Sequence, residues 1–480
     1  MSPRTSILPS WLLSPFGSAR VPLQLLAATC ASLLGAYAVV NEGDFRVVLG
    51  VVGVIAFAAV GLARPALFLG LLLLVRPLLD KIGQKHVGGL NASGALGLFV
   101  VLTLAGVILT SKGSYKPRAT GAFGIVLGLS ALGLLPAYIY YSGTIGAKPV
   151  SELVRVAAML GVYVLAAQLF DTPKKLTTLF TIVALSGVVP AILGIIEWTH
   201  QGKAGGLDIV RIGGPFDGPN PFGMFLASTA LVMIGLPRRV LPSWVRFVSL
   251  GLMLAALVGT YSRAGWALFL VGFMLLMWRR KPWAVGLGVV AVVSLIMLVP
   301  TIHDRVLPPN KTTGSGVATP ESFQFRLNNW STLLKKWENR PVTGYGIDTT
   351  STVNPRKTYD QNTGSFGGGF AAHNSVVKLL VEGGVVLLVA WLALIAIVTN
   401  RTRTLSRRRW PFQWQARTVF VLWVASIVVG LSTDDPLAAS AMIYGVFALT
   451  GALEGTYERL PRTAETAPAS ASAPVATRAP

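Results

Sequence analysis

The sequence predicts an all-α fold: a polytopic bundle of membrane-spanning helices with one large loop outside the membrane. The composition is the first reason, since 53% of the 480 residues are hydrophobic, only 12% are charged, and the mean hydropathy is +0.63. A soluble domain carries about 25% charged residues, so this chain has too little polar surface for a water-soluble fold. The second reason is a series of apolar runs of about 20 residues, the length that crosses about 30 Å of hydrocarbon as a helix. The third is one long polar segment, 301–374, between two such runs.

The apolar runs predict about 12–14 transmembrane helices. The third run is short and contains Arg76, so it is either a re-entrant segment or the partner of its neighbour. The candidate runs lie near 22–40, 47–63, 65–79, 92–110, 120–140, 151–170, 176–197, 220–236, 243–260, 264–279, 283–300, 375–399, 416–432 and 436–454.

The net charge of +22 has two readings. In a soluble protein it would suggest a nucleic-acid partner. Here most Lys and Arg residues fall in alternate connecting segments, as the positive-inside rule requires if both termini are cytoplasmic. We therefore expect no nucleic-acid partner and a multi-pass protein of the cytoplasmic (inner) membrane, with the bilayer as its surroundings.

This topology divides the chain into five parts. Residues 1–21 form a cytoplasmic segment, and 22–300 hold transmembrane helices 1–11. Residues 301–374 form a large periplasmic or extracellular loop, in which apolar residues between 325 and 337 recur at helical spacing. This spacing predicts an amphipathic helix that lies on the membrane or caps the bundle. Residues 375–456 hold the last transmembrane helices, and 463–480 are rich in Ala, Pro, Ser and Thr, which predicts a disordered tail.

Two motifs precede apolar helices on the predicted outer face. The first is R-I-G-G-P-F-D-G-P-N-P-F, from Arg211, in which Asn220 and Pro221 suit an N-cap and a first-turn proline. An arginine beside a helix N-terminus is suited to bind an anion, although a plain cap with a surface arginine is the alternative. The second is G-T-Y-S-R-A-G, a tight turn with Ser262 and Arg263, whose arginine is either functional or an interfacial anchor.

Two further motifs belong to the large loop and its end. Arg326 lies on the predicted amphipathic helix and is followed by P-V-T-G-Y-G-I around Tyr345, where the glycines would let the backbone approach a ligand closely. The alternative is a solvated charge and an ordinary turn. The fourth motif is A-H-N-S, in which His373 precedes Asn374 or Ser375 as the cap of the next helix. The positive end of the helix dipole favours a neutral imidazole, and the alternative is a capping cluster with an incidental histidine.

Taken together, these motifs collect three arginines and one histidine on one face of the membrane. Arginine binds phosphate through two parallel hydrogen bonds, and several arginines can hold a diphosphate. A neutral histidine can accept the proton of an attacking hydroxyl. The sequence contains neither a metal-ligand motif nor a Walker loop, so we expect no metal and no cofactor. A sugar carried on a lipid diphosphate requires neither.

The order of the motifs resembles the O-antigen ligase/polymerase superfamily of bacterial membrane glycosyltransferases over about residues 205–400. The patterns are R-x-G-G-P-F-x-x-P-N, T-x-S-R-x-G, R-x-x-x-W before P-x-T-G-Y-G, and H-N-S-x-x-K-L-L-x-E-x-G. The resemblance implies a glycosyltransferase-C-like fold and a metal-independent, inverting transfer from an undecaprenyl-diphosphate-linked glycan to a glycan or lipid-glycan acceptor. Such a reaction would serve the synthesis of a cell-envelope polysaccharide such as lipopolysaccharide.

By motif, the essential histidine of the family corresponds to His373, and its phosphate-binding arginines to Arg263, Arg326 and Arg211. We expect four further residues of the motifs to bind substrate: Asn220, Ser262, Tyr345 and Asn374.

Several alternatives stay open at this stage. The acceptor could be a protein, as in a protein O-oligosaccharyltransferase. The chain could also be a transporter or flippase of lipid-linked glycans, or an inactive scaffold, although charges within the runs are few, as at Arg76 and Arg155. The competing catalytic base is a carboxylate. The candidates are Glu382, two turns into the helix that follows His373, and Glu42 or Asp44 in the first outer loop.

Overall fold

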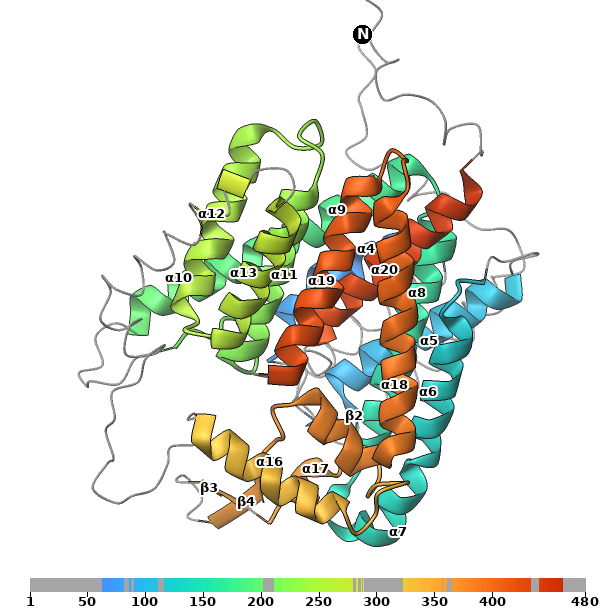
Figure 1. The fold of residues 1–480 in the computed structure, drawn as a ribbon, viewed down its shortest axis with the longest axis vertical. Coiled ribbons are helices and arrows are strands. Elements are labelled where there is room, and N and C mark those ends of the chain that lie inside the picture. The colour runs from blue at the N-terminus through green and yellow to red at the C-terminus, as the bar shows by residue number, and fades with distance from the viewer. Residues whose placement is uncertain are drawn as a thin grey trace, which may run out of the picture.

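The computed structural model describes most of the chain between residues 63 and 460 (Figure 1). The described residues are 63–81, 86–87, 90–110, 116–201, 211–278, 323–355, 357–360, 365–432 and 440–460, with isolated positions between 282 and 288. The runs predicted at 22–40, 47–63 and 283–300, the first part of the large loop and the C-terminal tail lie outside these residues, apart from a few single positions.

The described residues form a bundle of helices, as the composition predicts. Among the residues that the structure describes, five helices are long and apolar enough to cross a membrane: Thr120–Gly143, Lys148–Leu169, Pro173–His200, Ser375–Arg407 and Gln413–Leu431. The helices are α4 (Pro65–Val75), η2 (Arg76–Leu78), α5 (Ala92–Thr110), α6 (Thr120–Leu132), α7 (Leu134–Ile145), α8 (Lys148–Leu169), α9 (Pro173–Leu185), α10 (Val188–Gln201), α11 (Pro219–Gly235), α12 (Ser243–Gly259), α13 (Arg263–Met277), α16 (Phe323–Trp337), α17 (Thr350–Val353), α18 (Ser375–Arg407), α19 (Gln413–Ser432) and α20 (Ser440–Arg459).

Two small antiparallel hairpins accompany the helices. β1 (His86–Val87) pairs with β2 (Leu90–Asn91), and β3 (Lys357–Asp360) pairs with β4 (Ser365–Gly369). The pattern of apolar runs gave no sign of them, because they lie in polar connecting segments. They leave the helical class of the fold unchanged.

Helix ends follow the local chemistry of the sequence. Proline stands in the first turn of α4, α8, α9 and α11, where its missing N–H has no intrahelical partner to lose. The run at 120–140 is divided into α6 and α7 at Gly133, whose carbonyl oxygen accepts the N–H of Ile347 at 3.2 Å. The run at 176–197 is divided into α9 and α10 near Gly187, where an added Cβ would lie 2.4 Å from the hydroxyl of Thr229.

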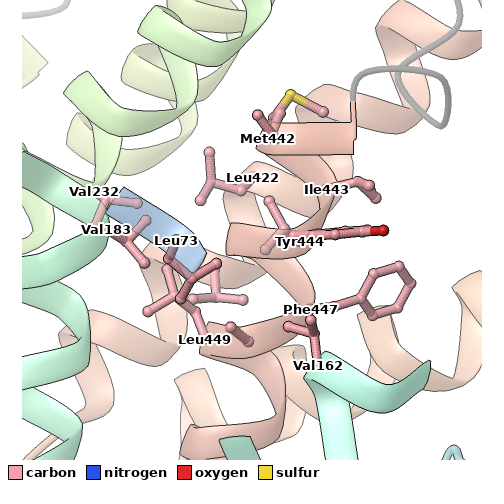
Figure 2. Packing of buried hydrophobic residues seen from close by; sticks show 14 of the residues in the cluster. Leu73, Val162, Val183, Val232, Leu422, Met442, Ile443, Tyr444, Phe447 and Leu449 are labelled. Carbon is pink, nitrogen blue, oxygen red and sulfur yellow. The ribbon is translucent and has the colours of Figure 1, made fainter. Parts of the chain in front are cut away.

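The core lies where α8, α9, α11, α19 and α20 meet, with α4 among them. Glycines on α20 allow its close approach to α8, since a Cβ at Gly451 or Gly455 would lie 2.1 or 2.0 Å from a carbonyl oxygen of α8. Small residues have this role in membrane bundles because close backbones maximise van der Waals contact. Figure 2 shows buried side chains of this core: Leu73, Val162, Val183, Val232, Leu422, Met442, Ile443, Tyr444, Phe447 and Leu449.

The two ends of the bundle carry different polar structures. Near one end, buried Arg401 pairs with Glu454 at 3.3 Å and also with Glu458, and Tyr163 donates to Glu454 at 2.5 Å. At the other end, α16, α17, β3 and β4 lie across the bundle, below it in Figure 1. The predicted amphipathic helix is therefore α16, and it caps the bundle by packing against the start of α18.

Candidate functional site

The loop that begins at Arg211 is held by hydrogen bonds to the turn after α12, to α11 and to α10. The Arg211 guanidinium donates to the carbonyl oxygen of Thr260 at 3.2 Å and to Oδ1 of Asn220 at 2.7 Å. The N–H groups of Gly213 and Gly214 donate to the carboxylate of Glu197 on α10, at 3.1 and 2.6 Å. The first two sequence motifs therefore form one unit at the N-terminal start of α11.

Asn220 has a different position from the predicted one. The N-cap of α11 is Gly218, without a side-chain cap, and Pro219 is the first helical residue. Proline suits that position because its φ is preset for a helix and it has no N–H to satisfy. Asn220 thus lies inside the first turn, and its amide oxygen accepts from Arg211 instead of capping the helix.

The second motif forms the expected tight turn. α12 ends at Gly259 and α13 begins at Arg263, with Ser262 as the N-cap, whose hydroxyl accepts the N–H of Gly265 at 3.2 Å. Arg263 is half-buried at the first position of α13, the positive end of the helix dipole. A Cβ on Gly265 would lie 2.6 Å from the carbonyl carbon of Gly223, which keeps α13 against α11.

The third and fourth motifs meet through α16. One turn after Arg326, the side chains of Asn329 and Trp330 donate to the carbonyl oxygens of Ala371 and Ala372, at 3.1 and 2.6 Å. These carbonyls directly precede His373. α16 therefore holds both the Arg326 turn and the segment that carries the histidine.

His373 lies exposed at the entrance to α18. Asn374 is the N-cap, as predicted, and its Oδ1 accepts the N–H groups of Val376 and Val377 at 2.9 and 3.1 Å. The Asn374 amide also donates to the carbonyl oxygen of Leu431 at 3.3 Å. The cap thus fixes the histidine to the ends of both α18 and α19.

The two pairs of motifs occupy the same end of the bundle. α19 packs against both α18 and α13. Arg417, early in α19, donates to the carbonyl oxygen of Leu275, late in α13, so the two helices run antiparallel. The Leu431 end of α19 therefore lies at the Arg263 end of α13, and Leu431 contacts Asn374. Figure 1 shows these ends facing α16.

Backbone strain is concentrated in these same segments. Within the described ranges, the non-glycine residues with positive φ are Tyr261 (47°), Asp348 (57°) and His373 (49°). Each lies in a motif or directly after one. Such conformations cost about 1–3 kcal/mol and gather at functional sites, where the surroundings enforce them.

The Gly-Tyr-Gly turn approaches the protein itself, not open space for a ligand. An added Cβ on Gly344, at φ 63°, would lie 2.6 Å from the Glu382 carbonyl, and one on Gly346 would lie 2.5 Å from the backbone of Ala137. Tyr345 is buried, and its hydroxyl donates to the carbonyl oxygen of Lys336 at 2.9 Å. The glycines are needed because the turn docks on α18 and α7.

This docking replaces hydrogen bonds of α18 itself. The helix is kinked at Gly384, with φ 64°. The N–H of Tyr345 donates to Val381 O at 2.8 Å, that of Gly346 donates to Glu382 O at 2.8 Å, and that of Val385 donates to Pro341 O at 2.9 Å. The large loop is thereby joined to the helix that begins at His373.

A group of buried charged side chains joins α8 to α18, the helix that begins beside His373. On α8, Glu152 pairs with Arg155, whose Nε donates at 2.6 Å, and with Lys378 of α18 at 3.1 Å. Burial raises the pKa of Asp348, and the nearby Glu152 raises it further, while Lys378 and Arg155 act in the opposite direction. α8, α18 and the loop are thus tied together electrostatically.

Glu382 is buried in the same region, 3% exposed, and accepts the hydroxyl of Thr350 at 2.8 Å. Its carboxylate is enclosed by protein, whereas His373 is exposed. Glu42 and Asp44 lie outside the described residues.

Three acidic residues with structural contacts around the site were not predicted from the sequence: Glu152, Glu197 and Asp348. The signal that could have found the first two is a carboxylate within an apolar helix, which requires a partner. Within the ranges that the structure describes, no three His, Cys, Asp or Glu residues are grouped to hold a metal ion. What the arrangement offers is guanidinium groups for an anion and one imidazole for a proton.

Part of the chain is similar to known proteins. Residues 248–392 match a family model described as O-antigen ligase. This part of the chain is therefore similar to proteins of the O-antigen ligase/polymerase superfamily. The chain is also 24% identical over 189 residues to an O-antigen ligase of Salmonella typhimurium, a match that covers 39% of this chain and 47% of the relative. The chain thus spans about half the length of the curated relative it matches.

The O-antigen ligase match covers most of the candidate site. It excludes Arg211 and Asn220 at its N-terminal side and includes the α12–α13 turn, α16, the docking turn and the start of α18. The candidate residues inside it are Ser262, Arg263, Arg326, Tyr345, His373 and Asn374.

Proposed function

We propose that the protein is a glycosyltransferase of the bacterial inner membrane that transfers a glycan from an undecaprenyl-diphosphate-linked donor to an acceptor hydroxyl at the outer face, without a metal. The observation that carries the proposal is the common location of four groups at one end of the bundle. An exposed, strained histidine at the start of α18 shares that end with the Arg211 loop, the Arg263 turn and the Arg326 helix.

The arginines would bind the diphosphate. Arg263 stands at the positive end of α13, where the helix dipole adds to its own charge. The Arg211 guanidinium donates to a carbonyl oxygen and to an amide oxygen, and these contacts position it at the start of α11. Guanidinium groups bind phosphate oxygens through parallel N–H groups.

In the reaction, the acceptor hydroxyl oxygen forms a bond to the anomeric carbon while the bond from that carbon to the diphosphate oxygen breaks. The bonding electrons leave with the diphosphate, whose growing charge the arginines stabilise. The hydroxyl proton passes to the imidazole of His373. Attack from the face opposite the leaving group inverts the anomeric carbon.

His373 fits the role of base better than Glu382. The imidazole is exposed at the boundary where a polar acceptor arrives, whereas the Glu382 carboxylate is buried and bonded to Thr350. The acceptor itself, whether glycan, lipid-linked glycan or protein, depends on surfaces that lie beyond these residues.

The experiment that tests the diphosphate role is a transfer assay on purified protein in the presence of a chelator. Arg263→Ala and Arg326→Ala should each lose about a hundred- to thousand-fold in rate, the usual loss for one electrostatic stabiliser. Arg→Lys should restore only part of it, because an ammonium group cannot make two parallel hydrogen bonds. Lys335→Ala, an exposed cation on α16, is the matched control and should stay active. Full activity of both arginine variants would refute the proposal.

A further inference from the structure

A groove of about 450 Å³ runs between α18 and α19. Its volume lies in the range of about 300–1,000 Å³ that is typical of ligand sites. It is lined mainly by apolar side chains of these two helices, with Ile443 of α20 at one point. The function proposed above does not use it.

The groove follows one face of each helix. On α18 it is lined by Leu388, Leu392, Ile395 and Thr399, which recur every three or four residues and so share a face. Trp391 and Trp423, 4% and 1% exposed, form part of its wall deep in the bundle. Leu392 and Leu431 are 48% and 55% exposed. The groove is therefore walled by packed aromatic rings and open sideways to the lipid.

One end of the groove reaches the candidate site. Ser375 and Leu431 line it there. Ser375 is the first residue of α18, two positions after His373, and Leu431 accepts the hydrogen bond of Asn374. A chain lying in the groove thus ends beside the imidazole.

The other end lies at Asn400 and Arg403. From Ser375 to Arg403 a helix rises by at most about 42 Å at 1.5 Å per residue, and the kink at Gly384 shortens this somewhat. The hydrocarbon core of a bilayer is about 30 Å thick. An acyl chain of an outer-leaflet phospholipid reaches only the bilayer centre and would fill about half of the groove.

We propose that this groove binds the hydrocarbon chain of the donor lipid, a polyprenyl chain long enough to pass through both leaflets, and presents its diphosphate at His373. The headgroup part of this statement rests on the function proposed above. The chain part rests on the apolar walls, the length and the continuity with the site. Burial of the chain against packed side chains supplies binding energy that does not depend on the glycan.

The test is binding of three probes to the purified protein, measured by native mass spectrometry: undecaprenyl diphosphate, farnesyl diphosphate and undecaprenol. Ala396→Trp fills the groove, whereas Ala393→Trp, on the same helix but outside the groove, is the matched control; both alanines are exposed. Ala396→Trp should weaken undecaprenyl diphosphate about tenfold, or about 1.4 kcal/mol, and leave farnesyl diphosphate unchanged. Ala393→Trp should bind all three probes as the wild type does.

A second pair of variants guards against misfolding. Leu392→Ala shortens a side chain of the groove, and Val389→Ala shortens one that is equally lipid-exposed but outside it. Only Leu392→Ala should weaken undecaprenyl diphosphate. Equal binding by wild type, Ala396→Trp and Leu392→Ala would overturn the proposal. As a competitor, phosphatidylglycerol is added to the same samples; if the groove variants weaken its binding and leave undecaprenyl diphosphate unchanged, the occupant is a phospholipid and the proposal is also overturned.

The third probe separates this proposal from the proposed function. If the arginines do not bind diphosphate, undecaprenol and undecaprenyl diphosphate should bind equally well, yet Ala396→Trp should still weaken both. If the groove assignment is wrong, the diphosphate should keep its advantage while the groove variants have no effect.

Discussion

Gly344→Ala is the sharpest test of how the large loop joins α18. Gly344 has a φ of 63°, and its Cβ would lie 2.6 Å from the carbonyl carbon and oxygen of Glu382. The obstacle is backbone, so a side-chain movement cannot relieve it. The turn and α18 must therefore separate.

The size of the effect follows from the contacts that separation breaks. A left-handed φ costs a non-glycine residue about 1–2 kcal/mol. Three backbone hydrogen bonds, from Tyr345, Gly346 and Val385, cross this contact, and a buried group left without its partner costs about 1–3 kcal/mol. Even if only one bond is lost, the variant should be destabilised by about 2 kcal/mol or more.

The assay is the thermal midpoint of the purified protein, followed by transfer activity. Gly344→Ala should melt well below wild type and lose activity, because the loop no longer holds the start of α18. Gly128→Ala is the control: it lies on α6 with nothing within 4 Å of an added Cβ, and alanine favours a helix by about 1 kcal/mol over glycine. Wild-type melting and activity in Gly344→Ala would refute the account of this contact.

Three further predictions concern topology, pH and the Arg211 loop. A reporter fused near Arg340 should act outside the cytoplasm and one near Leu405 inside; a cytoplasmic Arg340 would overturn the outer-face assignment. The raised pKa of Asp348 means that the folded state holds its proton more tightly, so Asp348 costs stability increasingly as pH rises above its ordinary range. This cost grows between the ordinary and the raised pKa and stays constant above it, so Asp348→Asn should raise the thermal midpoint more at pH 7 than at pH 4, close to the ordinary pKa. An equal change at both would contradict this. Glu197→Gln, which weakens the contact with the Arg211 loop, should raise KM for the donor and leave the melting temperature close to that of the wild type, and an unchanged KM would count against the loop's role.

The sequence predicted the membrane helices closely because their signal is local. A run such as 92–110 corresponds to α5 over the same residues, since an apolar span needs only its own side chains and intrahelical hydrogen bonds. The cap at Asn374 and the tight turn before Arg263 are equally local.

The parts that were missed depend on residues far apart in the chain. Glu152 meets Lys378 across 226 positions, and nothing near either residue signals the pair. The Gly-Tyr-Gly turn was correctly marked as a place of close approach, but the sequence could not tell that its neighbour is α18 and not a ligand. Asn220 is not the N-cap of α11 because the helix begins one residue earlier, at Pro219, whose fixed φ suits the first helical position.

The central claim, that His373 takes the proton of the acceptor hydroxyl, is tested most directly by a transfer assay on His373→Ala without added metal. The variant should lose about a hundred- to ten-thousand-fold in rate, the usual range for a general base, while it still binds the lipid-linked donor. If His373→Ala keeps its rate while Glu382→Gln or Asp44→Asn abolishes transfer, the base is a carboxylate and the account is wrong.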